Sequence, residues 1–404
     1  MGAFETLAGM SRFERRAAGS DAERRAANWL SDELRHARRE ARIEAFWCRP
    51  NWALTHAWHV GIGLAGTLVA VGSAKTGAAV ILIALASVIA DALFGRSIGR
   101  RLTPEHASQN VVSPVPDGEP PKRVRLIVTA NYDAGRTGVV FRDRARGMTA
   151  WLRRRTRGLT PGWLGWIVIA LVWLELIALV RIGGSGATAI GLAQLPPTVG
   201  LVLALAALLE IAGAEFSPAA GDNASGVAVA IALVRALDAA PPRHLHVDLV
   251  LQGASDGSGV GLSRYFERRR GRFTRADTLV LGVAACGGGE LCWWSADGPL
   301  VALGFFAPLR RVAAEIAARD PQLALRSHAG RGTTPALPAR LRRLPAITIG
   351  ATDERGVVPR SHQANDTIDA VDVSTLARAV EAGLLLVDGI DAVLAAESRV
   401  PTRA

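Results

Sequence analysis

The chain has few cysteines and few aromatic residues, and each shortage excludes a class of protein. Its three cysteines, Cys48, Cys286 and Cys292, form no Cys-x-x-Cys pair and no disulfide framework, which is typical of a reducing compartment. Aromatic residues make up 5% of the sequence and no basic stripe is interleaved with them, so nucleic acid is not an expected partner. Residues 1–49 contain no apolar core segment, so no cleavable signal peptide is expected.

Apolar residues are abundant instead: they make up 50% of the 404 residues, and mean hydropathy is +0.22. They are concentrated in two blocks, and each block holds two runs of the length that a bilayer-spanning helix needs. These runs cover residues 56–72, 77–94, 163–182 and 198–214. Helices inside a globular domain are seldom apolar on all sides for this length. The sequence therefore predicts four membrane spans in two helical hairpins.

Arginine residues beside the hairpins predict the orientation of the chain. The net charge is +11, and seven arginines lie between Arg142 and Arg157 alone, whereas the loops inside the hairpins carry only Lys75 and Arg181. The positive-inside rule then places both termini and every soluble segment in the cytoplasm, with the hairpins in the cell membrane. The basic flanks suit anionic lipid headgroups, so the lipid bilayer is the first predicted partner.

The hairpins divide the chain into soluble and membrane segments. The soluble domain is predicted in residues 1–55, 96–160 and 216–404, with transmembrane hairpins at 56–95 and 161–215. Strand-like and helix-like runs alternate in the soluble segments, which predicts an α/β domain with a mostly parallel sheet covered on both faces. Such domains bind ligands at the carboxyl ends of their strands.

Several polar residues stand where a ligand site of this kind is expected. Asp133, Ser255, Asp256 and the loop with His362 all follow predicted strands directly. Asp222 lies between small residues at the entrance of a helix, where backbone N–H groups are free and where it can equally serve as the helix cap. We expect these residues to lie together.

Two of these loops carry a recognisable pattern. Residues 221–226 read Gly-Asp-Asn-Ala-Ser-Gly, and residues 361–369 read Ser-His-Gln-Ala-Asn-Asp-Thr-Ile-Asp. They resemble the Asp-Asn-x-Ser-Gly loop and the His-x-x-x-Asp-Thr element of the zinc aminopeptidases of peptidase clan MH, the family of bacterial leucyl aminopeptidase, aminopeptidase Y and glutamate carboxypeptidase. Asn131 and Asp133 stand where that family has His-x-Asp. The resemblance implies a three-layer zinc-exopeptidase-like domain, with the two hairpins as insertions.

The resemblance implies that part of the metal site is retained. In the family, carboxylates and imidazoles hold two zinc ions, and a Glu takes the proton of the bridging water. Asp222 and His362 match the family's ligands, and Asp256 stands at the second position of its Glu-Glu pair. These three residues imply a site for at most one zinc ion.

The resemblance also implies losses. Asn131 occupies the position of a zinc-binding His, and no carboxylate stands near Ala284, where the remaining Asp ligand falls. Asp133 matches the residue that orients the missing His. Ser255 occupies the position of the general base. We therefore expect an integral membrane protein whose peptidase-like domain binds a protein or peptide-like ligand, or acts as a scaffold, without peptidase activity.

Two enzymatic alternatives remain open. One is residual aminopeptidase or hydrolase activity with one zinc ion. The other is a serine hydrolase, because Ser255 lies in a Gly-x-Ser-x-Gly motif between a strand and a helix, with Asp353 and His362 following in the chain order of α/β-hydrolases. Within the predicted spans, Glu175 is the acid of most interest, either as a hydrogen-bonding group in the bundle or as a functional group.

Overall fold

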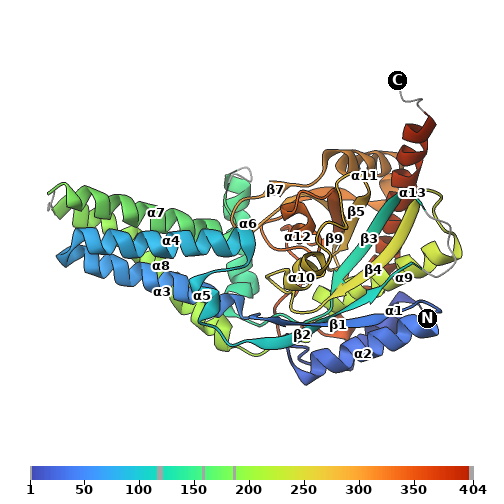
Figure 1. Ribbon diagram of the computed structural model, residues 1–404, viewed down its shortest axis with the longest axis horizontal. Helices are drawn as coiled ribbons and strands as arrows, with labels where there is room; N and C mark the ends of the chain where they lie inside the picture. The colour runs from blue at the N-terminus through green and yellow to red at the C-terminus, as the bar shows by residue number, and fades with distance from the viewer. Residues whose placement is uncertain (1, 116–121, 157–159, 185–187, 400–404) are drawn as a thin grey trace.

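A nine-stranded mixed sheet forms the centre of the domain (Figure 1). The computed structural model describes residues 2–115, 122–156, 160–184 and 188–399. The strand order is β1-β2-β4-β3-β5-β9-β6-β7, and β8 pairs with β6. The strands are β1 (Arg42–Cys48), β2 (His106–Ser113), β3 (Val124–Asn131), β4 (Leu245–Gln252), β5 (Thr278–Val283), β6 (Glu290–Asp297), β7 (Leu303–Gly304), β8 (Arg326–Ala329) and β9 (Ala346–Thr352).

The predicted parallel arrangement holds for the four central strands. β4, β3, β5 and β9 run parallel to one another, whereas β1 with β2, β2 with β4, and β6 with β9 and β7 are antiparallel. Central strands that are buried on both faces read as continuous apolar runs, and β3 and β4 have this pattern. The carboxyl ends of the four central strands therefore meet at one edge.

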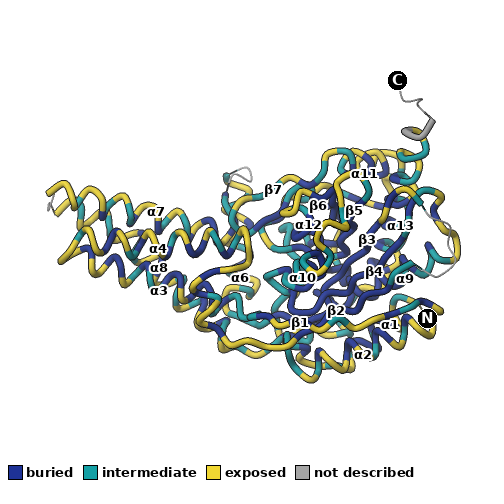
Figure 2. Tube along the Cα trace, in the orientation of Figure 1, coloured by how far each residue is buried: buried dark blue, intermediate teal, exposed yellow. Residues whose placement is uncertain are grey.

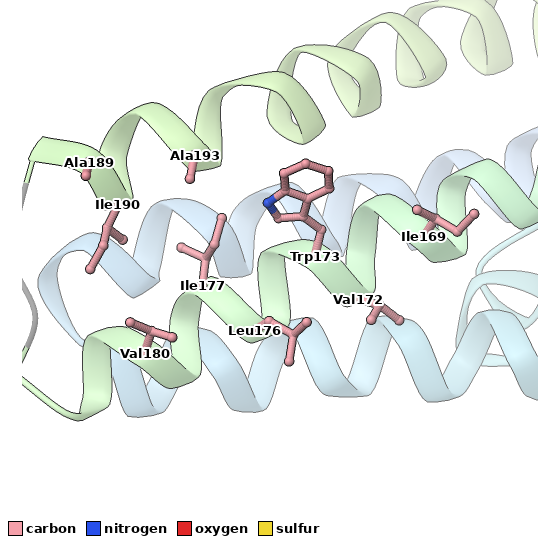
Figure 3. A pocket seen from close by; sticks show the side chains of 9 residues that line it. All are labelled: Ile169, Val172, Trp173, Leu176, Ile177, Val180, Ala189, Ile190 and Ala193. Atoms are coloured by element: carbon pink, nitrogen blue, oxygen red, sulfur yellow. The ribbon is translucent and has the colours of Figure 1, made fainter.

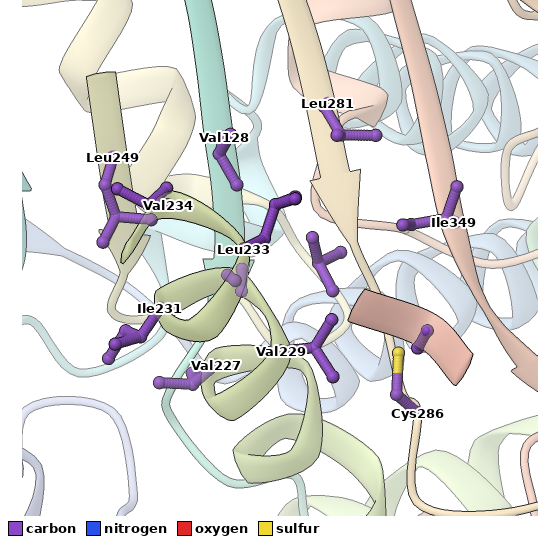
Figure 4. Packing of buried hydrophobic residues seen from close by; sticks show 14 of the residues in the cluster. Val128, Val227, Val229, Ile231, Leu233, Val234, Leu249, Leu281, Cys286 and Ile349 are labelled. Atoms are coloured by element: carbon purple, nitrogen blue, oxygen red, sulfur yellow. The ribbon is translucent and has the colours of Figure 1, made fainter. Parts of the chain in front are cut away.

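Helices cover both faces of the sheet and complete three layers. One face is covered by α1 (Ala3–Ser11), α2 (Asp21–His36), α9 (Ser225–Ala239), α11 (Ala307–Arg319) and α13 (Val373–Arg399). The other face is covered by α10 (Val260–Arg268) and α12 (Leu337–Leu341). Figure 4 shows the larger core around α9, toward which one residue from each central strand points: Val128, Leu249, Leu281 and Ile349. The predicted α/β fold is confirmed.

Four long helices form a bundle that extends from the domain (Figure 1). They are α3 (Trp52–Gly72), α4 (Ala74–Phe94), α7 (Trp163–Ile182) and α8 (Thr188–Gly213). Their own apolar core is separate from the core of the domain, and their outer surface is largely exposed although it is apolar (Figure 2). The close packing of α3 against α4 depends on small residues. If Gly66 of α3 carried a Cβ, that atom would lie only 2.9 Å from the backbone nitrogen of Ile81 in α4.

The described chain has five helical segments that are long and apolar enough to cross a membrane, by length and composition alone. Four are the bundle helices. The fifth, Ala220–Ala239, is 78% buried and packs on the sheet, so it is a core helix of the domain. The carboxylate of Glu175 in α7 has one oxygen with no hydrogen-bond partner among the described groups.

The sequence places the start of the fourth apolar run at residue 198, after a loop that ends in Pro196 and Pro197, and the expectation that the helix begins there is wrong. In the structure α8 begins at Thr188 and contains Pro196 and Pro197. Proline lacks an N–H group and so removes a helical hydrogen bond, but helices in apolar surroundings tolerate this when neighbouring helices support them.

Both hairpins leave the domain at the edge where the central strands end. β1 runs antiparallel to β2, which runs antiparallel to β4, so β1 and β4 end at the same edge. The first hairpin starts directly after β1 and returns through α5 (Ile98–Arg101) to β2. Its base is fixed by a buried ion pair in which Arg100 donates two 2.8 Å hydrogen bonds to Asp91. The second hairpin is preceded by α6 (Asp143–Arg155) and followed by a π-helical turn, Ala220–Ala224.

A buried carboxylate, Glu23 of α2, joins three segments of the domain. It accepts hydrogen bonds from the N–H groups of Gly19 and Ala254 and from the hydroxyl of Ser108. Burial raises the pKa of Glu23 to about 7, against the hydrogen bonds that favour its charged form. A Glu in the unfolded chain has a pKa of about 4.3. Between about pH 4.3 and 7, Glu23 is therefore protonated in the native state and charged in the unfolded chain.

We predict that Glu23 contributes roughly 3 kcal/mol to the free energy of unfolding below about pH 4.5, and that the free energy decreases by this amount as the pH rises through about 7. The Glu23→Gln variant should lose most of this decrease because its side chain does not titrate. The measurement is the thermal midpoint in detergent with a chelator, at pH 5 and pH 8. An equally large decrease in the variant would contradict the assignment.

Candidate metal centre

Three potential metal ligands meet at the carboxyl edge of the sheet. Asp222 comes from the π-helical turn, Asp256 from the loop after β4 and His362 from the loop after β9, and their ligand atoms all lie within 4.8 Å of one another. Nε2 of His362 is 3.9 Å from Oδ2 of Asp222 and 3.7 Å from Oδ1 of Asp256. The three side chains are 11–15% exposed, so the group is enclosed yet reachable.

His362 is held so that one ring nitrogen faces the carboxylates. Its Nδ1 lies 2.8 Å from the carbonyl oxygen of Arg136, an acceptor, so Nδ1 carries the proton and Nε2 presents its lone pair. Phe141 stacks on the ring, with centroids 4.4 Å apart. Burial alone lowers the pKa of His362, but the charges of Asp256 and Asp222 outweigh it and raise the pKa. A histidine anchored through its second nitrogen is typical of metal ligands.

The backbone around His362 leaves no spare room. A Cβ on Gly135 would lie 2.3 Å from Cε1 of His362 and 2.5 Å from Oδ2 of Asp256. His362 itself has a φ of 60°, which is unusual for a residue other than glycine. Strain of this kind persists only where surrounding contacts impose it.

The turn that carries Asp222 is fixed by Asp366. The carboxylate of Asp366 accepts hydrogen bonds from the N–H groups of Gly221 (2.9 Å) and Asp222 (3.0 Å). Burial, and then the charge of Asp222, raise the pKa of Asp366 to about 7. Ser361 donates a 2.7 Å hydrogen bond to Oδ2 of Asp222. Sequence analysis gave Asp366 no role, although it is the Asp of the matched His-x-x-x-Asp-Thr element.

Asp133 positions the loop of Asp256. Its Oδ2 accepts hydrogen bonds from the N–H groups of Ser255 and Asp256, both at 3.0 Å, and its other oxygen has no partner among the described residues. Burial, followed by the charges of Asp256 and Glu23, raises the pKa of Asp133 well above its usual range. Asn223 completes this arrangement by donating to the carbonyl of Asp133 at 2.7 Å and to Asp256 at 3.3 Å.

The two other positions that the resemblance singled out lie outside the three-ligand group. Asn131 ends β3, and its side-chain oxygen has no hydrogen-bond partner among the described residues. Ala284 follows β5, and its carbonyl oxygen packs closely against Gly226. A Cβ added to Gly226 would lie 2.6 Å from this oxygen. Neither position belongs to the group of ligands that the described structure assembles.

The hydroxyl of Ser255 faces the interior of the domain. It accepts the N–H of Gly261 at 2.9 Å, and its acceptors are Gln252 Oε1 at 3.0 Å and the carbonyl of Gly253 at 3.1 Å. Ser255 is fully buried. Asp353 bonds instead to Arg355. Within the described chain, the residues of the serine-hydrolase alternative form no hydrogen-bonded triad.

One cation beside the carboxylates was missed by sequence analysis. Arg146 of α6 is buried and donates to the carbonyl of Val358, in the loop that leads to His362. Its other terminal nitrogen, Nη1, has no hydrogen-bond partner among the described groups. The sequence offered no sign of this, because Arg146 lies in an arginine-rich stretch that predicts only contact with lipid.

A cavity of about 340 Å³ lies between the centre and the bundle. Its lining includes Asp133, Gly135 and Asp256 on the side of the sheet. On the other side are Pro50, Asn51, Trp52, Ala53 and Leu54, at the start of the first hairpin. The centre therefore has space for part of a ligand on the side of the bundle.

The donor set fits one zinc ion. Two carboxylates and one imidazole are common zinc ligands, and bonds of about 2.1 Å in a tetrahedron separate ligand atoms by about 3.4 Å. The two separations from the histidine, 3.7 and 3.9 Å, exceed this value by a few tenths of an ångström, and the two carboxylates offer oxygen atoms within 4.8 Å of each other. Three protein ligands leave one position for a ligand or water.

Comparison with known proteins identifies a related family and related folds. Residues 206–387 match the model of peptidase family M28. A search of curated proteins found no match to this sequence.

Among solved structures, a zinc aminopeptidase from Bacillus subtilis aligns with a TM-score of 0.54 and 13% identity, over 97% of this chain and 94% of that one. A glutaminyl cyclase from Bacteroides thetaiotaomicron aligns with a TM-score of 0.52 and 14% identity, over 96% of both chains. LapB from Legionella pneumophila aligns with a TM-score of 0.52 and 11% identity, over 96% of this chain and 71% of the other. These likenesses confirm the fold, and together with the match to peptidase family M28 they confirm the resemblance to zinc aminopeptidases.

The close approach at Gly135 gives a direct test of the centre. Gly135→Ala should displace His362 and Asp256 and weaken zinc binding by about 10- to 100-fold, as changes around metal ligands commonly do. Gly147→Ala in α6 is the matched control, because a Cβ there meets nothing within 4 Å. The affinity is measured by competition with a chromogenic chelator. Equal affinities in the two variants would show that zinc does not bind here.

Proposed function

We propose, from the premise that the chain carries an M28 peptidase-like domain, that it is a membrane-anchored protein that binds a peptide-like ligand at a single zinc ion without hydrolysing it. The observation that carries the proposal is the contrast between an assembled three-ligand group and a buried Ser255 where the family's base is expected.

Asp222, Asp256 and His362 would hold the zinc ion. When bound, it supplies a Lewis acid that attracts an oxygen or nitrogen atom of the ligand. The chain contributes the fixed orientation of these side chains, through Asp366, Asp133 and the carbonyl of Arg136. A hydroxyl that is buried and engaged with Gln252 is poorly placed to remove a proton from water.

The surface of the bundle supports membrane anchoring. Its outer residues are apolar and exposed, which would be unfavourable in water over such an area. An apolar groove of about 550 Å³ lies between α7 and α8. Figure 3 shows side chains that line it, such as Trp173, Leu176 and Ile190. Lipid tails would cover these side chains. We propose further that the domain lies on the cytoplasmic side, as the arginine flanks predict.

A second candidate function is residual hydrolysis with one zinc ion. It is favoured by the three-ligand group, because three protein ligands leave a fourth position on zinc that a water molecule can occupy. In this case the ligand is a substrate and the cavity beside Asp256 receives part of it.

Cleavage and binding assays on purified, zinc-loaded protein distinguish these two functions. We expect aminoacyl anilides and a mixed peptide library to remain intact by mass spectrometry, at the level of the Asp222→Ala/His362→Ala variant. We also expect immobilised wild-type protein to retain peptides that the double variant releases. Cleavage that requires both residues would establish the hydrolase and contradict the proposal.

The orientation has its own test. A cysteine at Thr188, at the end of the bundle far from the domain, should react with a membrane-impermeant maleimide on intact cells. A cysteine at Ala314, exposed on α11, should react only after lysis. The native cysteines are buried, so they add little background. The reverse pattern would place the domain outside the cell.

A further inference from the structure

We propose that α6 is an interfacial helix whose outer face binds an anionic bilayer surface while its inner face holds the loop that carries His362. This inference rests on the proposed membrane anchoring and assigns a lipid-binding surface to a segment outside the bundle.

The outer face of α6 combines apolar and cationic side chains. Met148 is 67% exposed and Trp151 is 62% exposed, and Leu152 beside them is also exposed. Arg144 and Arg155 are exposed on the same side of the helix. A face on which tryptophan and aliphatic side chains alternate with arginine suits the headgroup region, because the rings and arginine stems contact acyl chains while the guanidinium groups remain with phosphate.

The charge of this face selects anionic lipid. The sole acid of α6 is Asp143, and it lies 3.5 Å from Arg355 of the domain, so it leaves the arginines of the outer face without an acid on their own helix. Each Arg near an anionic membrane surface is attracted to the lipid phosphates. An acidic protein would complement the charge but would not account for the exposed Trp and Met beside it.

The position of α6 agrees with a place at the membrane surface. Figure 1 shows α6 crossing the domain end of the bundle, transverse to the bundle helices. A helix transverse to spanning helices at their end lies in the plane of the bilayer surface. The residues before α6 are tied to the bundle, because the N–H of Val139 donates to the carboxylate of Glu210 in α8. Val139 and Val140 are themselves exposed and extend the apolar surface.

The inner face of α6 contacts the loop of the metal centre. Arg146 donates to the carbonyl of Val358, and Arg153 donates to the carbonyls of Arg355 (3.2 Å) and Gly356 (3.1 Å). These bonds satisfy backbone carbonyls of the segment that leads from β9 to His362. One helix therefore faces the bilayer on one side and the metal centre on the other, which fixes the centre close to the lipid surface.

Spin labels on the full chain in nanodiscs test the proposal. Met148→Cys carries a nitroxide on the outer face, and Ala314→Cys on α11 is the control on the domain. Accessibility to oxygen, which concentrates in lipid, is compared with accessibility to a water-soluble nickel chelate. In phosphatidylcholine mixed with phosphatidylglycerol, we expect the Met148 label to favour oxygen and the Ala314 label to favour nickel.

The second part of the experiment removes the charge of the outer face of α6 or the charge of the lipid. The double variant Arg144→Gln/Arg155→Gln, or nanodiscs of phosphatidylcholine alone, should shift the Met148 label toward nickel. A Met148 label as accessible to nickel as the Ala314 label would overturn the proposal. So would a label shielded from both reagents, because a protein, such as a second copy of this chain, would then cover the face.

A third label separates this proposal from the membrane anchoring itself. Leu176→Cys lies on the exposed side of α7. Oxygen accessibility at Leu176 together with nickel accessibility at Met148 would overturn the role of α6 and leave the anchoring intact. Nickel accessibility at both positions would contradict the anchoring as well.

Discussion

The orientation of one imidazole ring is the constraint on which the centre depends. The contact between His362 Nδ1 and the carbonyl of Arg136 fixes the proton on one nitrogen and turns the other toward two carboxylates. It requires a glycine at position 135 and a left-handed backbone at His362, and the stacked ring of Phe141 closes the remaining side. Arg136 in turn pairs with Phe216 in an isolated β-bridge, where the chain returns from the bundle. The geometry of the centre and the base of the bundle are thus one structural unit.

The sheet explains why these parts meet. Parallel central strands bring the loops of Asp133, Asp256 and His362 to one edge, and the direction of β1 brings the first hairpin to the same edge. A ligand at the centre therefore lies next to the bundle, with a cavity between the two. Buried acids around the centre, Asp133 and Asp366, have raised pKa values and bond to backbone N–H groups, so they shape the ligand loops from behind.

Much of this architecture could be predicted from the sequence because its signals are local. The apolar run Thr278–Val283 predicts β5 with its observed bounds. The runs Val124–Ala130 and His246–Leu251 predict β3 and β4 to within one residue at either end, since buried parallel strands are continuous apolar runs. The group formed by Asp222, Asp256 and His362 follows from strand ends together with the family resemblance. The roles of Asp366 and Arg146 could not be predicted, because they depend on which backbone groups the fold brings near, as at Gly221 and Val358. The start of α8 was misplaced because paired prolines usually end a helix, whereas packing against α7 supports this one.

The central claim is that Asp222, Asp256 and His362 hold one zinc ion, whereas a two-metal site would need further ligands. Elemental analysis of protein purified in detergent, beside the Asp222→Ala/His362→Ala variant, tests it most directly. The account predicts one zinc ion per chain in the wild type and none in the variant. Two ions per chain would show that further ligands had been overlooked, and no ion in the wild type, even after exposure to zinc, would contradict the metal centre altogether.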